Sequence, residues 1–196
     1  MATSDPIVLE PNSLYILLFR QGEAYQFHWG LFLTTTTSST PAAEETVESP
    51  ESAAPAETTA TTSPPGTLFE LINPNPSNSR HWTYSTSTLA TFTHKNNPIS
   101  ALKISTIEPI LHEPVHALLA TIPVVTYSHR FGEDMSCRVW LKEALYALDQ
   151  SGFIQLVWTV DEIEKEAKGL GMLCWCSGIG RGNARGRAKR SAGCLF

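Results

Sequence analysis

A cysteine, a histidine and a glutamate in this chain could together perform covalent chemistry. The cysteine is Cys137. It stands in the segment EDMSCRVWLKEALYAL, at the point where an amphipathic helix is expected to begin. Helix N-termini carry a partial positive charge and unpaired N–H groups, which favour thiolates and can hold an oxyanion. The alternative interpretation is a structural cysteine in the core, because free cysteine is among the most buried residue types.

A cysteine nucleophile needs a base, which is normally a histidine. Of the six histidines, His28 is the preferred candidate, because it interrupts the apolar segment FHWGLFL. His129, in the segment that leads to Cys137, is the second choice. On its own, His28 is more typical of a satisfied core histidine than of a catalytic one. For the other four histidines, surface or core roles suffice: His81, His94, His112 and His116.

Glu70 is the candidate for a third group, an acid that orients the base. It lies among apolar residues in TLFELIN, so it should be exposed at a strand edge or paired. If strand 66–73 lies beside strand 25–33, Glu70 can hold the His28 ring and stabilise its protonated form. The alternative is an exposed glutamate on a strand face.

These residues must be positioned by strands and helices, and the sequence patterns of those elements predict an α+β fold. A small antiparallel sheet should pack against the helix that begins at Cys137. In strand 25–33, alternation places Phe27, Trp29, Leu31 and Leu33 on one face and His28 on the other. The predicted strands are 13–20, 25–33, 66–73, 81–86 and 101–108, and the predicted helices are 113–121, 137–150 and one near 160–170.

The length and the charge distribution predict a single domain with two appendages. The domain is expected over 7–173, since 196 residues with 42% hydrophobic side chains suffice for one core. The Thr/Ser/Pro/Ala/Glu-rich segment 34–65 carries five glutamates and no basic residue, and is predicted to be a disordered insertion between two strands. The segment 174–196 carries five basic residues and no acid, and is predicted to be a Gly/Arg/Cys-rich tail.

Several classes of protein are disfavoured by the sequence. No targeting or membrane-spanning segment is evident, so a cytoplasmic location with thiol cysteines is expected. Neither a metal site nor a cofactor is expected, because Cys174 and Cys176 have no second Cys/His pair at a suitable spacing. Nucleic acid is not an expected partner, although an RG-rich tail can contact RNA by charge. A basic tail with cysteines can also hold a protein at a membrane surface.

The three motifs together resemble the circularly permuted papain-like superfamily of lecithin–retinol acyltransferase-like proteins and bacterial cell-wall peptidases. HWGLFL is similar to that family's histidine strand, GTLFELIN places Glu70 where a second polar residue is usual, and SCRVWLKEAL is similar to its cysteine helix. The chain also resembles fungal proteins with a CRVWLKEAL-type helix. The resemblance spans about residues 13–150 without the low-complexity insertion.

The resemblance implies a cysteine-dependent hydrolase or acyl/amide transferase that forms an acyl–thioester with an acyl or amide substrate. Cys137 would be the nucleophile, His28 the base and Glu70 its orienting acid. The chain departs from the family pattern at Ser136, Arg138 and Glu70, which replaces the usual second histidine. These departures favour the alternative function, a catalytically inactive interaction module with the same fold.

Overall fold

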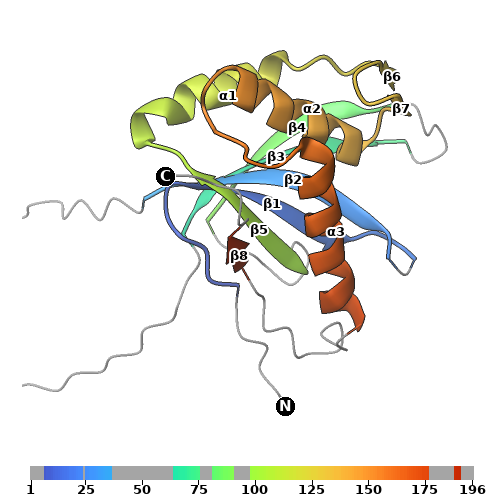
Figure 1. Cartoon of the computed structure of the whole chain (residues 1–196), viewed down its shortest axis with the longest axis horizontal. Coiled ribbons are helices and arrows are strands. Elements are labelled where there is room, and N and C mark those ends of the chain that lie inside the picture. The colour runs from blue at the N-terminus through green and yellow to red at the C-terminus, as the bar shows by residue number, and fades with distance from the viewer. Residues whose placement is uncertain are drawn as a thin grey trace, which may run out of the picture.

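The computed structural model describes residues 7–23, 25–36, 64–75, 81–90 and 98–176, and the backbone of 188–190. Figure 1 shows a curved sheet with helices packed around it. The strands are β1 (Ser13–Arg20), β2 (Phe27–Thr34), β3 (Gly66–Ile72), β4 (Thr83–Leu89), β5 (Ser100–Thr106), β6 (Tyr127–Ser128), β7 (Glu133–Asp134) and β8 (Ala188–Arg190). The helices are α1 (His112–Thr121), α2 (Cys137–Gln150) and α3 (Val160–Cys176), with a 3₁₀ turn at Pro109–Leu111.

Five of these strands form an antiparallel sheet in the order β4-β3-β2-β1-β5, so the predicted α+β class is confirmed. The short strand β8 adds to the β5 edge in parallel orientation. Strands β6 and β7 pair with each other in a separate ribbon that leads into α2. The sequence pattern had not indicated this ribbon, because two-residue strands leave no periodic signal.

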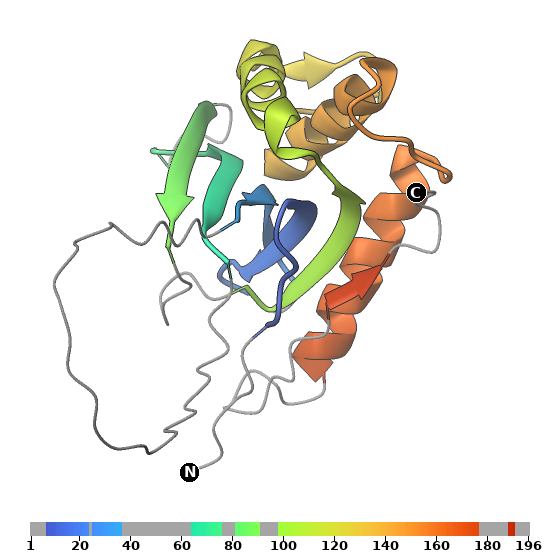
Figure 2. The same cartoon turned by 90° about the vertical axis from the view of Figure 1, so that its left-hand side faces the viewer.

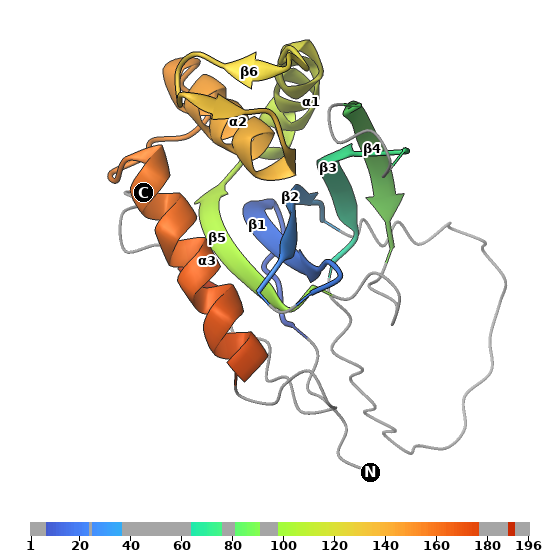
Figure 3. The ribbon, with the colours of Figure 1, turned by 90° about the vertical axis from the view of Figure 1, so that its right-hand side faces the viewer.

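The two faces of the sheet build two apolar clusters. Phe27, Trp29, Leu31 and Leu33 pack in the larger cluster with α2, whereas Phe32 joins a smaller cluster on the opposite face. The predicted alternation along β2 is therefore confirmed. Figures 2 and 3 show α2 and α3 on the outside of the curved sheet; α2 packs on β2 and β3, and α3 packs on β5 and β1.

Helix α2 has the apolar face that its spacing predicts. Leu141, Ala144, Leu145 and Leu148 recur at the i, i+3, i+4 and i+7 positions, and each is 0% exposed. Burying one leucine side chain stabilises a fold by about 2 kcal/mol. This face therefore fixes the helix on the sheet, and with it the position of Cys137 at its start.

The low-complexity segment joins two neighbouring strands. Its first described residues follow β2 and its last precede β3, where the Thr35 amide donates a hydrogen bond to the Pro65 carbonyl at 2.7 Å. The strands are thus paired up to the base of the insertion, as the sequence predicts. The predicted disorder concerns 37–63, which lie outside the described residues.

The C-terminal boundary differs from the prediction. Helix α3 continues to Cys176 and so includes the first three residues of the predicted tail 174–196. Cys174 is buried on the inner side of that helix, and the backbone of 188–190 pairs with β5. The extension follows from apolar residues that continue the helical period beyond 170. Over the described part of the chain, every helix is too short or too polar to cross a bilayer.

Candidate functional site

Glu70 and His28 come from adjacent strands and contact each other directly. Strands β2 and β3 pair from Gly30–Glu70 to Thr34–Gly66, which places Glu70 opposite Gly30 and diagonal to His28. His28 Nε2 lies 2.6 Å from Glu70 Oε2, and the two side chains are 20% and 17% exposed. The expected pairing of Glu70 is thus present in the structure.

Gly30, which lies opposite Glu70, is in close contact with β3. A Cβ atom at this position would come within 2.8 Å of Leu68 Cδ1 and 3.4 Å of the Phe69 carbonyl. A larger residue would therefore first displace the Leu68 side chain.

Cys137 is the second polar neighbour of the His28 ring. His28 lies beyond the last β2–β3 pair, where the Cys137 side chain is near enough to raise the pKa of the ring. Glu70 contacts Nε2, so Nδ1 is the other ring nitrogen that can carry a proton. The imidazole is thus shared by a thiol and a carboxylate from two other elements.

The pKa of the His28 ring depends on these two neighbours and on its burial. Burial of the ring lowers the pKa of His28, but the hydrogen bonds and electrostatic attraction of Cys137 and Glu70 outweigh it and raise the pKa to about 9. The ring therefore carries a proton at neutral pH. A protonated imidazole beside a sulfur atom can donate that proton to a leaving group.

Local structure at the start of α2 fixes the cysteine. Ser136 is the N-cap residue in extended conformation, and its side chain accepts a hydrogen bond from the Val139 amide at 3.3 Å. Ser136 thus caps the helix, as a serine at this position commonly does. Cys137 is the first residue of the helix and is 5% exposed, which agrees with the prediction that it faces the core.

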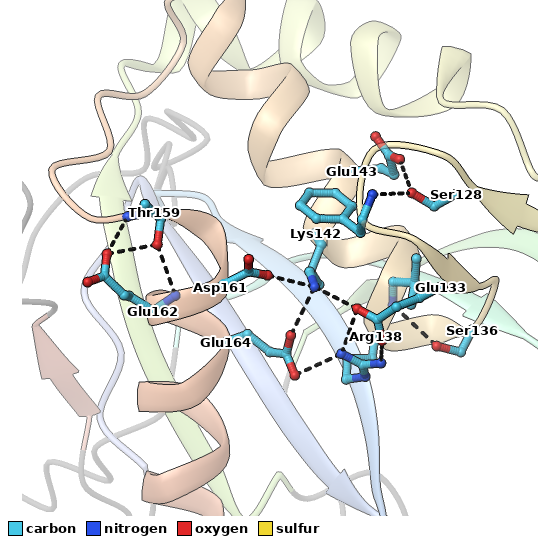
Figure 4. Close-up of polar contacts among 12 residues, drawn as sticks. Ser128, Glu133, Ser136, Arg138, Lys142, Glu143, Thr159, Asp161, Glu162 and Glu164 are labelled. Carbon is cyan, nitrogen blue, oxygen red and sulfur yellow. Dashed lines mark hydrogen bonds and ion pairs between the residues drawn. The ribbon is translucent and has the colours of Figure 1, made fainter.

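A charged cluster lies at the same end of α2 (Figure 4). Lys142 is only 4% exposed, yet its Nζ lies 2.8 Å from Glu133, 2.7 Å from Asp161 and 3.3 Å from Glu164. Arg138 pairs with Glu133 and, at 2.8 Å, with Glu164. We call these five residues the α2–α3 ion cluster. It connects β7, the first turns of α2 and the first turn of α3.

The ion cluster accounts for the charged residue that follows Cys137. Arg138 follows Cys137, but its guanidinium is directed to Glu133 and Glu164. It therefore stabilises the packing of α2 against α3. Arg138 and Lys142 stand four residues apart on α2, and Asp161 and Glu164 three apart on α3. These spacings place each like-charged pair on one face of its helix, but the sequence does not show that the two faces meet.

The other histidines lie apart from this site. The second-choice base, His129, is exposed and its ring packs edge-on against Tyr127 at 5.2 Å. His112 Nε2 contacts the Ile107 carbonyl at 3.2 Å, and His116 packs against Phe69. His81 is exposed, and His94 is outside the described residues. The structure therefore brings only His28, among the histidines it describes, into contact with Cys137.

Sequence reasoning did not anticipate a group of buried donors beside α2. Tyr84 on β4 and Trp140 on α2 have ring centroids 5.4 Å apart, and burial raises the pKa of Tyr84 to about 12. The Trp82 and Trp140 indole nitrogens and the Tyr84 hydroxyl are buried without a partner among the described residues. The only sequence signal for this group was the presence of three aromatic residues. Whether their polar atoms find hydrogen-bond partners depends on tertiary packing.

Comparison with protein-family models, with curated proteins and with solved structures returned no match for this chain. In the described ranges, no group of three or more His, Cys, Asp or Glu side chains is arranged to hold a metal ion. The interpretation of the site therefore depends on the geometry of Cys137, His28 and Glu70.

Proposed function

We propose that the protein is a cysteine-dependent hydrolase or acyl/amide transferase that works through an acyl–thioester. The observation that carries this proposal is the His28 imidazole, held between the Glu70 carboxylate and the Cys137 side chain. A nucleophile, a base and an acid that orients the base are the groups that covalent acyl transfer requires. The proposed substrates are acyl compounds or amides.

In the first step the thiol proton of Cys137 is held on His28, the sulfur adds to the substrate carbonyl carbon, and unpaired N–H groups at the start of α2 hold the oxyanion. The C–S bond forms, and the bond to the leaving group breaks as His28 donates a proton to that group. In the second step His28 takes a proton from water or an amine, which attacks the thioester. The C–S bond breaks and the sulfur is restored.

The order of the elements supports a permuted papain-like arrangement as the finer proposal for the fold. A histidine strand is followed by a neighbouring strand with a polar partner, and a helix then begins at the cysteine. Glu70 in the partner position can still orient the ring, because a carboxylate accepts a hydrogen bond from Nε2–H. Nothing in this arrangement selects lipid, peptide or modified protein as substrate.

The test is the rate at which iodoacetamide alkylates each cysteine at about pH 6, measured by peptide mass spectrometry. Cys176 is exposed and serves as the internal control in the same chain. We expect Cys137 to be alkylated at least about tenfold faster than Cys176, and His28→Ala to remove this difference. The proposal fails if Cys137 reacts no faster than Cys176.

One observation favours the second candidate, an inactive interaction module. Cys137 is 5% exposed, and a substrate must reach its sulfur. In that case the Cys137–His28–Glu70 contacts would serve to hold β2, β3 and α2 together. The alkylation experiment separates the two functions, because a purely structural thiol reacts more slowly than the exposed Cys176 at every pH.

A further inference from the structure

The outer surface of α3 differs in character between its two halves. All its acidic residues lie in the first half, and the last eight residues, GLGMLCWC, carry no charge. Met172 and Leu173 are 39% and 68% exposed, which is unusual for adjacent large apolar residues on a helix that packs by another face. The acids are Asp161, Glu162, Glu164 and Glu166.

The exposure of these side chains follows from how tightly the inner face packs. Ala167 and Cys174 are buried, and a Cβ at Gly171 would lie 2.7 Å from Leu18 Cδ1 and 3.3 Å from Phe27. The helix therefore cannot rotate to bury Leu173 without separating from the sheet. The apolar outer side is a fixed feature of the fold.

Cations surround this apolar area. Lys168 is exposed one helical turn before Met172, and the Arg20 guanidinium lies 4.7 Å from the Trp175 ring. The chain after α3 carries five basic residues and no acid. Its backbone at 188–190 pairs with β5, the strand on which α3 also packs (Figure 2). The backbone of Lys189 and Arg190 therefore lies at the β5 edge of the sheet.

We propose that this surface, formed by Lys168, Met172, Leu173 and Cys176, docks on an anionic membrane. Apolar side chains that enter the boundary between headgroups and acyl chains add to the attraction of cations for acidic lipids. RNA would use the same cations but would gain little from an exposed leucine and methionine. The proposal does not depend on the reaction proposed for Cys137.

The test is co-sedimentation of the full chain with vesicles of phosphatidylcholine containing about 30% phosphatidylserine, at about 0.1 M salt. We expect binding to these vesicles and little to pure phosphatidylcholine. The double variant Met172→Glu/Leu173→Glu should lower the partition coefficient at least about tenfold, because it places two carboxylates at the bilayer surface. Lys168→Gln should lower it about fivefold.

The matched control is Val125→Glu/Val157→Glu, which makes the same charge change at exposed apolar residues outside α3. It should retain binding to within about twofold. All variants replace exposed side chains, and circular dichroism checks that each is folded. The proposal is overturned if the wild type does not bind the acidic vesicles, or if the two double variants lose binding equally. The proposal is also overturned if salt abolishes vesicle binding while the α3 double variant still binds. That result would indicate a purely electrostatic surface, such as one for RNA.

Discussion

Two polar clusters lie at the same end of α2, and their composition is very different. The ion cluster surrounds Lys142 with three carboxylates and gives Arg138 two of the same partners. The second cluster consists of Cys137, His28 and Glu70, and we call it the reactive cluster after the chemistry proposed for it. Its imidazole has a thiol and a carboxylate as neighbours. In the ion cluster every charged group has an oppositely charged partner, whereas the proposed reactive cluster holds a protonated imidazole beside a sulfur atom. The first arrangement is suited to stabilising the fold and the second to chemistry.

The largest expected effect belongs to the reactive cluster. Cys137→Ala should reduce the hydrolysis of an activated ester such as p-nitrophenyl acetate by about a thousandfold or more, because no other group replaces the sulfur. Stability should change by only about 1 kcal/mol, since the substitution removes a single buried atom. Cys176→Ala is the control and should leave the rate unchanged. Equal loss in both variants would assign the activity to nonspecific thiol chemistry.

A substitution in the ion cluster should lower the stability strongly and leave the reactivity of Cys137 nearly unchanged. Lys142→Ala leaves Glu133, Asp161 and Glu164 without their shared ammonium group and should lower the free energy of unfolding by about 3 kcal/mol. Lys142→Met retains the bulk beside Phe131 and separates packing from charge. Urea unfolding measures both variants. Alkylation of Cys137 should stay within about twofold of wild type, and a large decrease would show that the two clusters act as one.

A smaller effect is expected from the pH dependence of stability. The pKa of folded His28, about 9, lies above its ordinary value of 6.5, so protonation favours the folded state. The stabilisation is complete below pH 6.5 and is lost as the pH rises through 9. At about 1.4 kcal/mol for each pKa unit, and with allowance for a partly exposed ring, the loss is about 2 kcal/mol.

Urea unfolding of wild type and His28→Gln at about pH 6 and pH 9.5 measures this term. The stability advantage of the wild type should shrink as the pH rises, since glutamine does not titrate in this range. An advantage that is constant with pH would mean that His28 has the same pKa in the folded and unfolded chains. The reactive cluster would then lack the electrostatic coupling that distinguishes it from the ion cluster.

The sequence allowed the reactive cluster to be anticipated better than the ion cluster. His28 and Glu70 interrupt apolar strands, and Cys137 stands at a predicted helix start, so each departs visibly from a local pattern. The start of α3 also has a local signal, because Thr159 and Glu162 stand three apart as in a capping box, and the Glu162 amide donates to Thr159 Oγ1 at 3.3 Å. Alternation and turn signals also predicted the five main strands, with differences of a few residues at their ends.

Lys142 shows why the remainder was not predicted. A lysine in an amphipathic helix is ordinarily assigned to the solvated face, but here α3 packs over it and supplies Asp161 and Glu164. That burial depends on how two helices cross, which no local pattern encodes. The same reason applies to Cys174, which is buried only because α3 continues past the predicted tail boundary and packs on the sheet.

The most direct test of the central claim is an NMR titration of the His28 ring, in wild type and in Cys137→Ala. His28→Gln identifies its signal among the six histidines. If the imidazole is shared by Cys137 and Glu70, its pKa should lie near 9 in the wild type and fall when the sulfur is removed. A pKa close to 6.5 in both proteins would contradict the account, because the histidine would then be coupled to neither group.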